Sequence, residues 1–145
     1  MAGWFLDISG GLDPQRNIKH VVVNNAIRTR GKTSFGIVAF TDGAVVVNNA
    51  ILSEGTEALA LGIRSSGGYI AFNKIEGASN RPGISVGPWK PLKGSNNVLM
   101  GNDLSGFRGA TADVGFDKDA CNNVFVGPSC KVNDLGSNNS VQMTK

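Results

Sequence analysis

One seven-residue segment recurs along the chain and restricts the fold more than any other feature. Residues 21–27 read Val-Val-Val-Asn-Asn-Ala-Ile, and residues 45–51 repeat all seven. Residues 69–75, 98–104 and 124–130 keep the pattern in altered form. Segments that recur every 20 to 50 residues or so are typical of repeat proteins, in which each unit buries its apolar face against the next.

Each repeat also holds a second short apolar run. These runs occupy residues 35–40, 59–63, 83–87 and 112–116, and Gly, Ser, Asp and Asn separate them from the first runs. Such residues favour tight turns, so no long helix fits between the runs. The pattern therefore predicts two short strands per repeat, with equivalent strands paired in parallel about 4.8 Å apart.

The corner segments resemble those of the right-handed parallel β-helix proteins, the pectate-lyase-like fold superfamily. The segments that carry the resemblance are 25–27, 49–51, 73–75, 102–104, 96–98 and 122–124. The resemblance covers residues 18–141 and implies an all-β, right-handed parallel β-helix (a solenoid) of about five coils. It implies no particular activity, because one scaffold hosts many chemistries.

The 145 residues are expected to form a single domain. Residues 1–20 stand outside the repeat and are predicted to form an N-terminal cap on the β-helix of residues 21–145. Trp4 and Phe5 are the expected plug of that cap, since an open end of stacked coils exposes its core. Ligand stacking on this aromatic pair is the alternative.

Composition argues against several classes of protein. The net charge is +3 and the basic residues are scattered, which argues against nucleic acid as a partner. No apolar run approaches the eighteen or so residues of a membrane span, and residues 1–7 lack the features of a signal peptide. We therefore expect a soluble protein with no membrane partner, while a trimmed signal or a longer parent protein stays open.

The few cysteines and histidines indicate no cofactor and no metal site. Cys121 and Cys130 are too few for a disulfide framework, and His20 is the only histidine. We expect free, structural thiols and a packed or solvated His20.

Strand alternation, counted back from the isoleucine of each repeat, predicts which side chains face inward. One expected inward row is Ile27, Ile51, Ile75, Leu104 and Cys130. The second is Val21, Val45, Tyr69, Val98 and Val124, and the third is Val23, Val47, Ala71, Met100 and Val126. Cys130 takes an isoleucine's place, which predicts a buried thiol. The aligned corner residues are expected to bond to one another or to the turn backbone: Asn25, Asn49, Asn73 and Asn102.

The same count predicts an apolar flank on the outside of the first strand. Its members are Val22, Val46, Ile70, Leu99 and Phe125. A row of exposed apolar side chains needs a cover. Either the N-terminal segment or a loop folds over the flank, or copies of the chain associate through it as a homo-oligomer.

The exterior of the second strand is small and polar, which predicts a shallow groove that suits a sugar ring. Its candidate ligand-binding residues are Arg64, Ser85, Trp89, Lys90, Asp113 and Asp117. A polysaccharide is the expected partner of such a groove. The alternative is a solvated face, with Trp89 packed under its own loop.

Catalysis is not expected. Carbohydrate-active enzymes of the resembled fold use clustered carboxylates, in lyases together with a basic residue. The nearest candidates here are Asp113, Asp117 and Asp119 with Arg64, Arg108 or Lys118. Gly115 separates the first two acids, and Ser85 occupies their row in the preceding coil. The sequence therefore favours a non-catalytic module for binding or assembly, and a carbohydrate-active enzyme or its degenerate relative is the alternative.

Overall fold

The computed structural model describes residues 6–8, 19–88 and 93–144. This described part holds sixteen strands and no helix, and its strands form three sheets in which every neighbouring pair is parallel. Valine- and isoleucine-rich runs of three to six residues, bounded by glycine and asparagine, make the strands short. The prediction of an all-β chain of parallel strands is confirmed, and the arrangement is compatible with a parallel β-helix.

The first sheet, sheet A, contains the second apolar run of each repeat. Its strands in spatial order are β1 (Leu6–Ile8), β4 (Phe35–Ala39), β7 (Leu59–Ile63), β10 (Ile84–Val86), β13 (Val114–Phe116) and β15 (Val132–Asp134). β1 extends the sheet beyond β4. The predicted plug, Trp4 and Phe5, lies outside the described residues, and the division into a cap and a repeat body stays a prediction.

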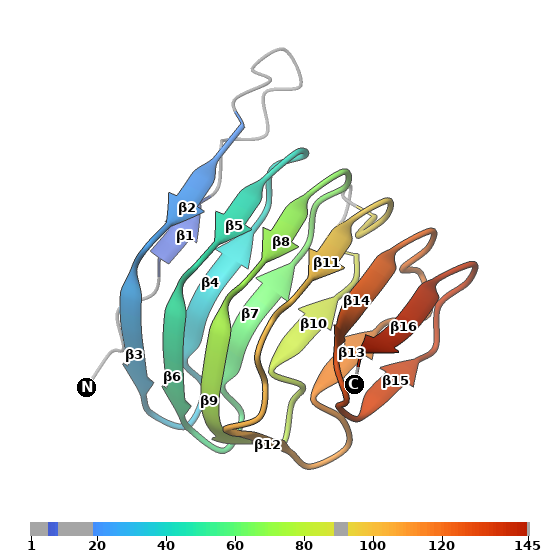
Figure 1. Cartoon of the computed structure of the whole chain (residues 1–145). Coiled ribbons are helices and arrows are strands. Elements are labelled where there is room, and N and C mark those ends of the chain that lie inside the picture. The colour runs from blue at the N-terminus through green and yellow to red at the C-terminus, as the bar shows by residue number, and fades with distance from the viewer. Residues whose placement is uncertain (1–5, 9–18, 89–92, 145) are drawn as a thin grey trace.

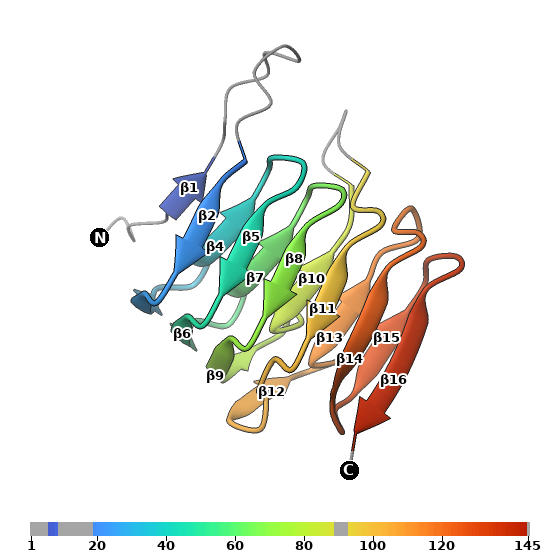
Figure 2. The same cartoon turned by 45° about the horizontal axis from the view of Figure 1, so that its top comes forward.

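Sheet B contains the first strand of each repeat, which begins the recurring segment first seen at residues 21–27. Its strands in spatial order are β2 (Val21–Val23), β5 (Val45–Val47), β8 (Tyr69–Ala71), β11 (Val98–Met100), β14 (Val124–Pro128) and β16 (Ser140–Thr144). Figure 2 shows these six strands side by side in front of sheet A. The register joins Val21 to Val45 and Val45 to Tyr69, so the segments found by their recurrence are direct neighbours.

Sheet C follows the asparagine corner, which divides the recurring segment into two strands, so these repeats have three strands and not the two predicted. Its strands in spatial order are β3 (Ala26–Arg30), β6 (Ala50–Glu54), β9 (Lys74–Ser79) and β12 (Phe107–Gly109). From β2 to β13 the chain passes from sheet B to sheet C to sheet A and back to sheet B, adding one strand to each in turn (Figure 1).

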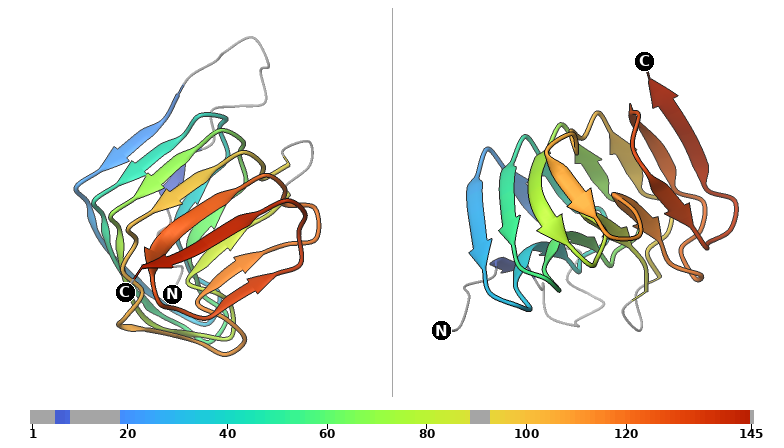
Figure 3. Two further views of the ribbon diagram at one scale, coloured as in Figure 1. Left: turned by 45° about the vertical axis from the view of Figure 1, so that its right-hand side comes forward. Right: turned by 90° about the horizontal axis from the view of Figure 1, so that it is seen from below.

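The three sheets enclose one apolar interior (Figure 3). Sheet A contributes Ile37, Leu61, Ile84 and Val114, which are fully buried. The predicted isoleucine row lies on sheet C and on the equivalent positions of the later repeats: Ile51, Ile75 and Leu104 are buried, and Ile27 and Cys130 pack partly buried against the core. That inward row is confirmed, although the Cys130 thiol is less buried than predicted.

The facing predicted for sheet B is wrong. The residues expected to form an exposed flank lie in the core with 0–5% of their surface exposed: Val22, Val46, Ile70, Leu99 and Phe125. Most residues of the other two predicted rows are exposed or partly exposed instead, including Val21, Val23, Tyr69, Met100 and Val124. Ala71 is the exception, since it is buried.

A left-handed residue at the corner is the physical reason for this inversion. Asn24 and Asn48 have φ of 60° and 54°, and each stands between a strand of sheet B and the following strand of sheet C. Alternation holds only along continuous extended backbone, so a count carried back from Ile27 through Asn24 arrives at the wrong face.

Two ladders of asparagine side chains support the corners. In the first, Nδ2 of Asn25, Asn49 and Asn73 donates to Oδ1 of the next asparagine at 2.9–3.0 Å, and the ladder ends at Asn102. The backbone N–H of each donor residue bonds to the same oxygen at 3.0 Å. The predicted structural role of these asparagines is confirmed, although the left-handed residue is the one before each of them.

The second ladder, at the entry to sheet B, has no counterpart in the sequence prediction. Asn97 donates to Asn123 at 2.9 Å and Asn123 donates to Asn139 at 3.0 Å. Asn139 Nδ2 donates in turn to the Asp134 carboxylate at 2.9 Å. A carboxylate of the last repeat therefore accepts the hydrogen bond that a further asparagine would accept.

Candidate interaction surface

The outer face of sheet B is a strip of apolar side chains over five strands. Its exposed or partly exposed members are Val21, Val23, Val45, Val47, Tyr69, Val98, Met100, Val124 and Val126. Val21 is 66% exposed, and Tyr69 and Met100 are 37% and 36% exposed. On the sixth strand, Ser140 and Gln142 occupy these positions, so the strip ends there. We call these side chains the sheet B strip.

The sheet B strip is uncharged. The six strands of the sheet contain no Lys, Arg, Asp, Glu or His. Isolated exposed apolar residues are ordinary on a protein surface, whereas a contiguous row across five strands is typical of an interaction site. The sequence prediction of an apolar exterior on this sheet thus has a structural counterpart, made by other residues than those predicted.

The largest exposed side chains gather at the middle of the strip. Tyr69 on β8 and Met100 on β11 are in contact, with Oη and Sδ 3.8 Å apart. Phe72, the corner residue after β8, is 55% exposed. A Cβ added at Gly101 would come within 2.8 Å of two ring atoms of Phe72, so the absence of a side chain at Gly101 makes room for the ring.

The side chains on the outer face of sheet A, from β4 to β13, are small and buried. Val38, Gly62, Ser85 and Gly115 share one row, as the alternation predicts, and each is buried. This row is not the open, solvated face that a shallow groove needs.

Three of the predicted groove residues come together beside that row. Arg64 donates from Nη2 to Ser85 Oγ at 3.1 Å, and its Nη1 lies 3.6 Å from an Asp117 carboxylate oxygen. The Arg64 side chain is only 12% exposed, and burial lowers its pKa, while the Asp117 carboxylate acts in the opposite direction. Nη1 of Arg64 is buried and makes no hydrogen bond, so its pairing with Asp117 is electrostatic only. Sugar binding by these groups stays a prediction.

The remaining predicted residues of that groove do not join the cluster or cannot be placed. Asp113 accepts backbone N–H groups from Lys131 at 2.9 Å and from Gly109 at 3.4 Å. Trp89 and Lys90 lie outside the described residues. Two of the three acids weighed as catalytic groups therefore have separate structural partners, Asp113 the backbone and Asp117 the Arg64 guanidinium.

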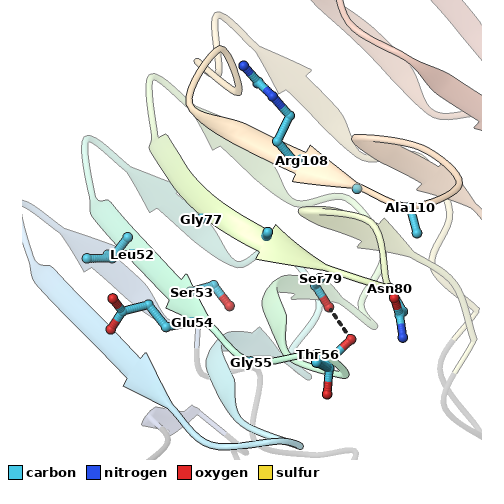
Figure 4. Close-up of a pocket in the computed structure, with 12 residues that line it drawn as sticks. Leu52, Ser53, Glu54, Gly55, Thr56, Gly77, Ser79, Asn80, Arg108 and Ala110 are labelled. Atoms are coloured by element: carbon cyan, nitrogen blue, oxygen red, sulfur yellow. Dashed lines mark hydrogen bonds between the residues drawn. The ribbon is translucent and has the colours of Figure 1, made fainter.

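Sheet C carries a hollow that the sequence did not predict (Figure 4). Its volume is about 700 Å³, and residues of β6, β9, β12 and the turns after them line it. Ala78 stands in register between Glu54 and Arg108, so a methyl group lies between two long side chains. The hollow exists because the middle strand carries small residues.

The charged groups beside this hollow are bound within the chain. Arg28 makes two bonds to the Glu54 carboxylate, at 2.8 and 2.9 Å, and Arg30 makes a third at 3.2 Å. These bonds lower the pKa of Glu54 to about 2. Arg108 donates from Nη1 to the carbonyl oxygens of Ser105 and Phe107 at 3.0 and 2.9 Å. The outer face of sheet C is thus charged and internally paired.

Both cysteines are free thiols, as predicted. Burial, with a smaller contribution from the Asp113 carboxylate, raises the pKa of Cys130 to about 11, so this thiol stays protonated and unreactive at neutral pH. Within residues 6–8, 19–88 and 93–144, no group of three or more His, Cys, Asp or Glu side chains could hold a metal ion. The same residues include no helix with the length and apolar character needed to cross a membrane.

Comparison of the chain with models of protein families, with curated proteins and with solved structures finds no match.

Proposed function

We propose that this chain is a right-handed parallel β-helix of about five coils, related in fold to the pectate-lyase-like superfamily, and that it acts as a non-catalytic assembly module. Copies of the chain associate as a homo-oligomer through the sheet B strip. The order in which the chain visits the three sheets supports the fold. The exposed strip supports the mode of action, and it is the observation that carries the proposal.

The occupant of the strip is a second copy of the chain, because the strip matches itself in chemistry and shape. A partner surface with charged groups would lose their hydration against these valines without gaining a counter-charge. Sheet C presents Arg28, Arg30 and Glu54, and Arg64 and Asp117 lie beside sheet A. Among the outer faces of the described residues, that of sheet B is the uncharged one. The surface that matches the strip in chemistry and length is therefore the same strip on another copy.

The geometry of the strip suits face-to-face packing of two sheets. Its two apolar rows are separated by the inward-pointing row of Val22 and its equivalents, so a ridge of one copy fits between the ridges of the other. Packed sheets lie about 10 Å apart, with their strands about 30° from alignment. Regular spacing along the strip gives every coil an equivalent contact.

The size of the strip sets the expected strength of association. Five strands about 4.8 Å apart and three residues at about 3.3 Å each give a footprint of a few hundred Å². Stable complexes bury about 800 Å² on each partner, so this contact falls in the weak class. The oligomer should therefore form only at high protein concentration and dissociate on dilution.

The decisive experiment is sedimentation equilibrium of the whole chain from about 1 to about 500 μM, together with two charge substitutions. Val47→Glu places a carboxylate in the strip and should leave the chain monomeric throughout. Ala50→Glu adds the same charge at an exposed position of sheet C in the same repeat, and it should associate as the wild type does. A wild-type chain that stays monomeric over the whole range would show that the proposal is wrong.

A further inference from the structure

Phe72 occupies a backbone conformation that its residue type disfavours. In the first four repeats the residue after the sheet B strand has φ between 54° and 60°, and these residues are Asn24, Asn48, Phe72 and Gly101. Asparagine and glycine tolerate this left-handed region, whereas a bulky aromatic residue there is strained. The third repeat therefore carries local strain that the other three avoid.

The ring held by this strained backbone is largely exposed. Phe72 is 55% exposed, compared with 37% for Tyr69 on the neighbouring strand β8. An asparagine at this position would make the same corner with less strain and would lose only the contacts of the ring, such as that with Gly101. Residues held in strained backbone conformations cluster at functional sites.

Phe72 lies at the corner beside the middle of the strip. It follows β8, the middle strand of the five that carry the strip, and Tyr69 of β8 and Met100 of β11 are the other large exposed side chains there. Aromatic residues near the centre of an interface dominate its binding energy, and methionine adapts its shape to a partner. The three side chains have the composition and the location of an anchor.

We propose that Phe72, flanked by Tyr69 and Met100, is the anchor that two copies of the chain share, and that the twofold axis of the pair lies near β8. This inference rests on the proposed function. In a twofold pair the same patch serves both copies, and the residues at the axis meet their own equivalents. When the axis runs parallel to the strands, complete overlap of two five-strand strips places it at the middle strand. The strain at Phe72 then serves association and not folding.

The test is Phe72→Asn, which copies the residue of the preceding repeat at an equal φ of 54°. Because one substitution removes the ring from both copies, the dissociation constant should rise about 30-fold or more. The midpoint of thermal unfolding of the monomer should stay the same or rise, since the backbone strain is relieved. Sedimentation equilibrium and thermal unfolding at low concentration measure the two effects.

Two further variants make every outcome decisive. Leu135→Asn removes a side chain that is 62% exposed outside sheet B and should change the dissociation constant less than about twofold. Phe72→Gly provides a second residue suited to positive φ. If both Phe72 variants unfold at lower temperature than the wild type, the ring serves folding and the inference is wrong.

The association data separate this inference from the proposed function. A wild-type dimer whose affinity is unchanged by Phe72→Asn, but lost with Val47→Glu, overturns the anchor and leaves the assembly proposal in place. A wild-type chain without association overturns both.

Discussion

The outer faces of sheets B and C come from the same repeats and differ in almost every property. Val47 and Ala50 are three residues apart, yet one lies in an uncharged strip and the other beside Lys74, which is paired with Glu76. Both faces rest on the same buried core and the same asparagine corner. Folding of this chain therefore constrains the residues of the inward rows, whereas the residues on each outer face can differ in polarity and charge.

The strongest test of this comparison substitutes two adjacent residues of β11. Leu99→Ala removes a fully buried side chain and should lower the free energy of unfolding by about 2–5 kcal/mol. Met100→Ala truncates a side chain of the strip and should change the stability of the monomer by less than about 0.5 kcal/mol. Urea unfolding at low protein concentration measures both. Equal losses would mean that the strip belongs to the folding core.

The asparagine ladder between the two faces should give the next largest effect. Asn73→Ala removes the amide that accepts two bonds from Asn49 and donates to Val46 and Asn102. Because these buried groups lose their partners, the free energy of unfolding should fall by about 2–3 kcal/mol. Asn25→Ala, at the exposed end of the same ladder, is the control and should cost less than half as much. A reversed order would contradict the support assigned to the ladder.

A smaller effect is expected from the ion pairs of sheet C. The pKa of Glu54 is lowered from 4.5 to about 2 by Arg28 and Arg30, so the folded chain binds this proton less readily than the unfolded chain does. The stabilisation is therefore complete above about pH 4.5 and is lost as the pH falls toward about 2. Glu54→Gln should remove this part of the acid dependence, as measured by the unfolding midpoint from about pH 6 to about pH 2. The carboxylate is exposed and screened by solvent, so the difference should be small, and identical acid profiles would argue against the pairing.

The smallest expected effect is that of salt on association through the sheet B strip. The response to salt therefore distinguishes a contact made by sheet B from one made by sheet C. A contact made by the uncharged strip should keep its dissociation constant within about twofold between about 0.05 and about 0.5 M salt. A contact made through the arginines of sheet C should weaken markedly over the same range. Sedimentation equilibrium at the two salt concentrations distinguishes these results.

More of the fold than of the surface could be predicted from the sequence. Recurrence of the valine segment predicted parallel pairing of equivalent strands, and the register of Val21 with Val45 confirms it. The isoleucine row was also predicted correctly, because Ile27, Ile51 and Ile75 stand at the same position after the corner and pair in register. The facing of sheet B was not, because Asn48 interrupts the extended backbone before Ala50.

The sequence holds a signal that would have prevented part of the error in the facing of sheet B. Two consecutive asparagines after each valine run are a turn signal, and alternation should have been counted afresh on each side of Asn24 and Asn25. Phe72 carries a signal of its own, since it replaces the asparagine that the first two repeats place there. The hollow on sheet C gave no such signal, because it depends on Ala78 lying between Glu54 and Arg108, which are far apart in sequence.

By itself, the sequence determined that the chain is all-β, that its repeats pair in parallel and that asparagines line one corner, because these properties follow from local residue preferences and from recurrence. Only the tertiary structure decided which valines are buried, which face of the molecule is uncharged and where an aromatic ring stays exposed. Those outcomes depend on the direction that the backbone takes after each corner and on the strands that lie on either side. A change of one residue in the alternation exchanges the interior for the surface.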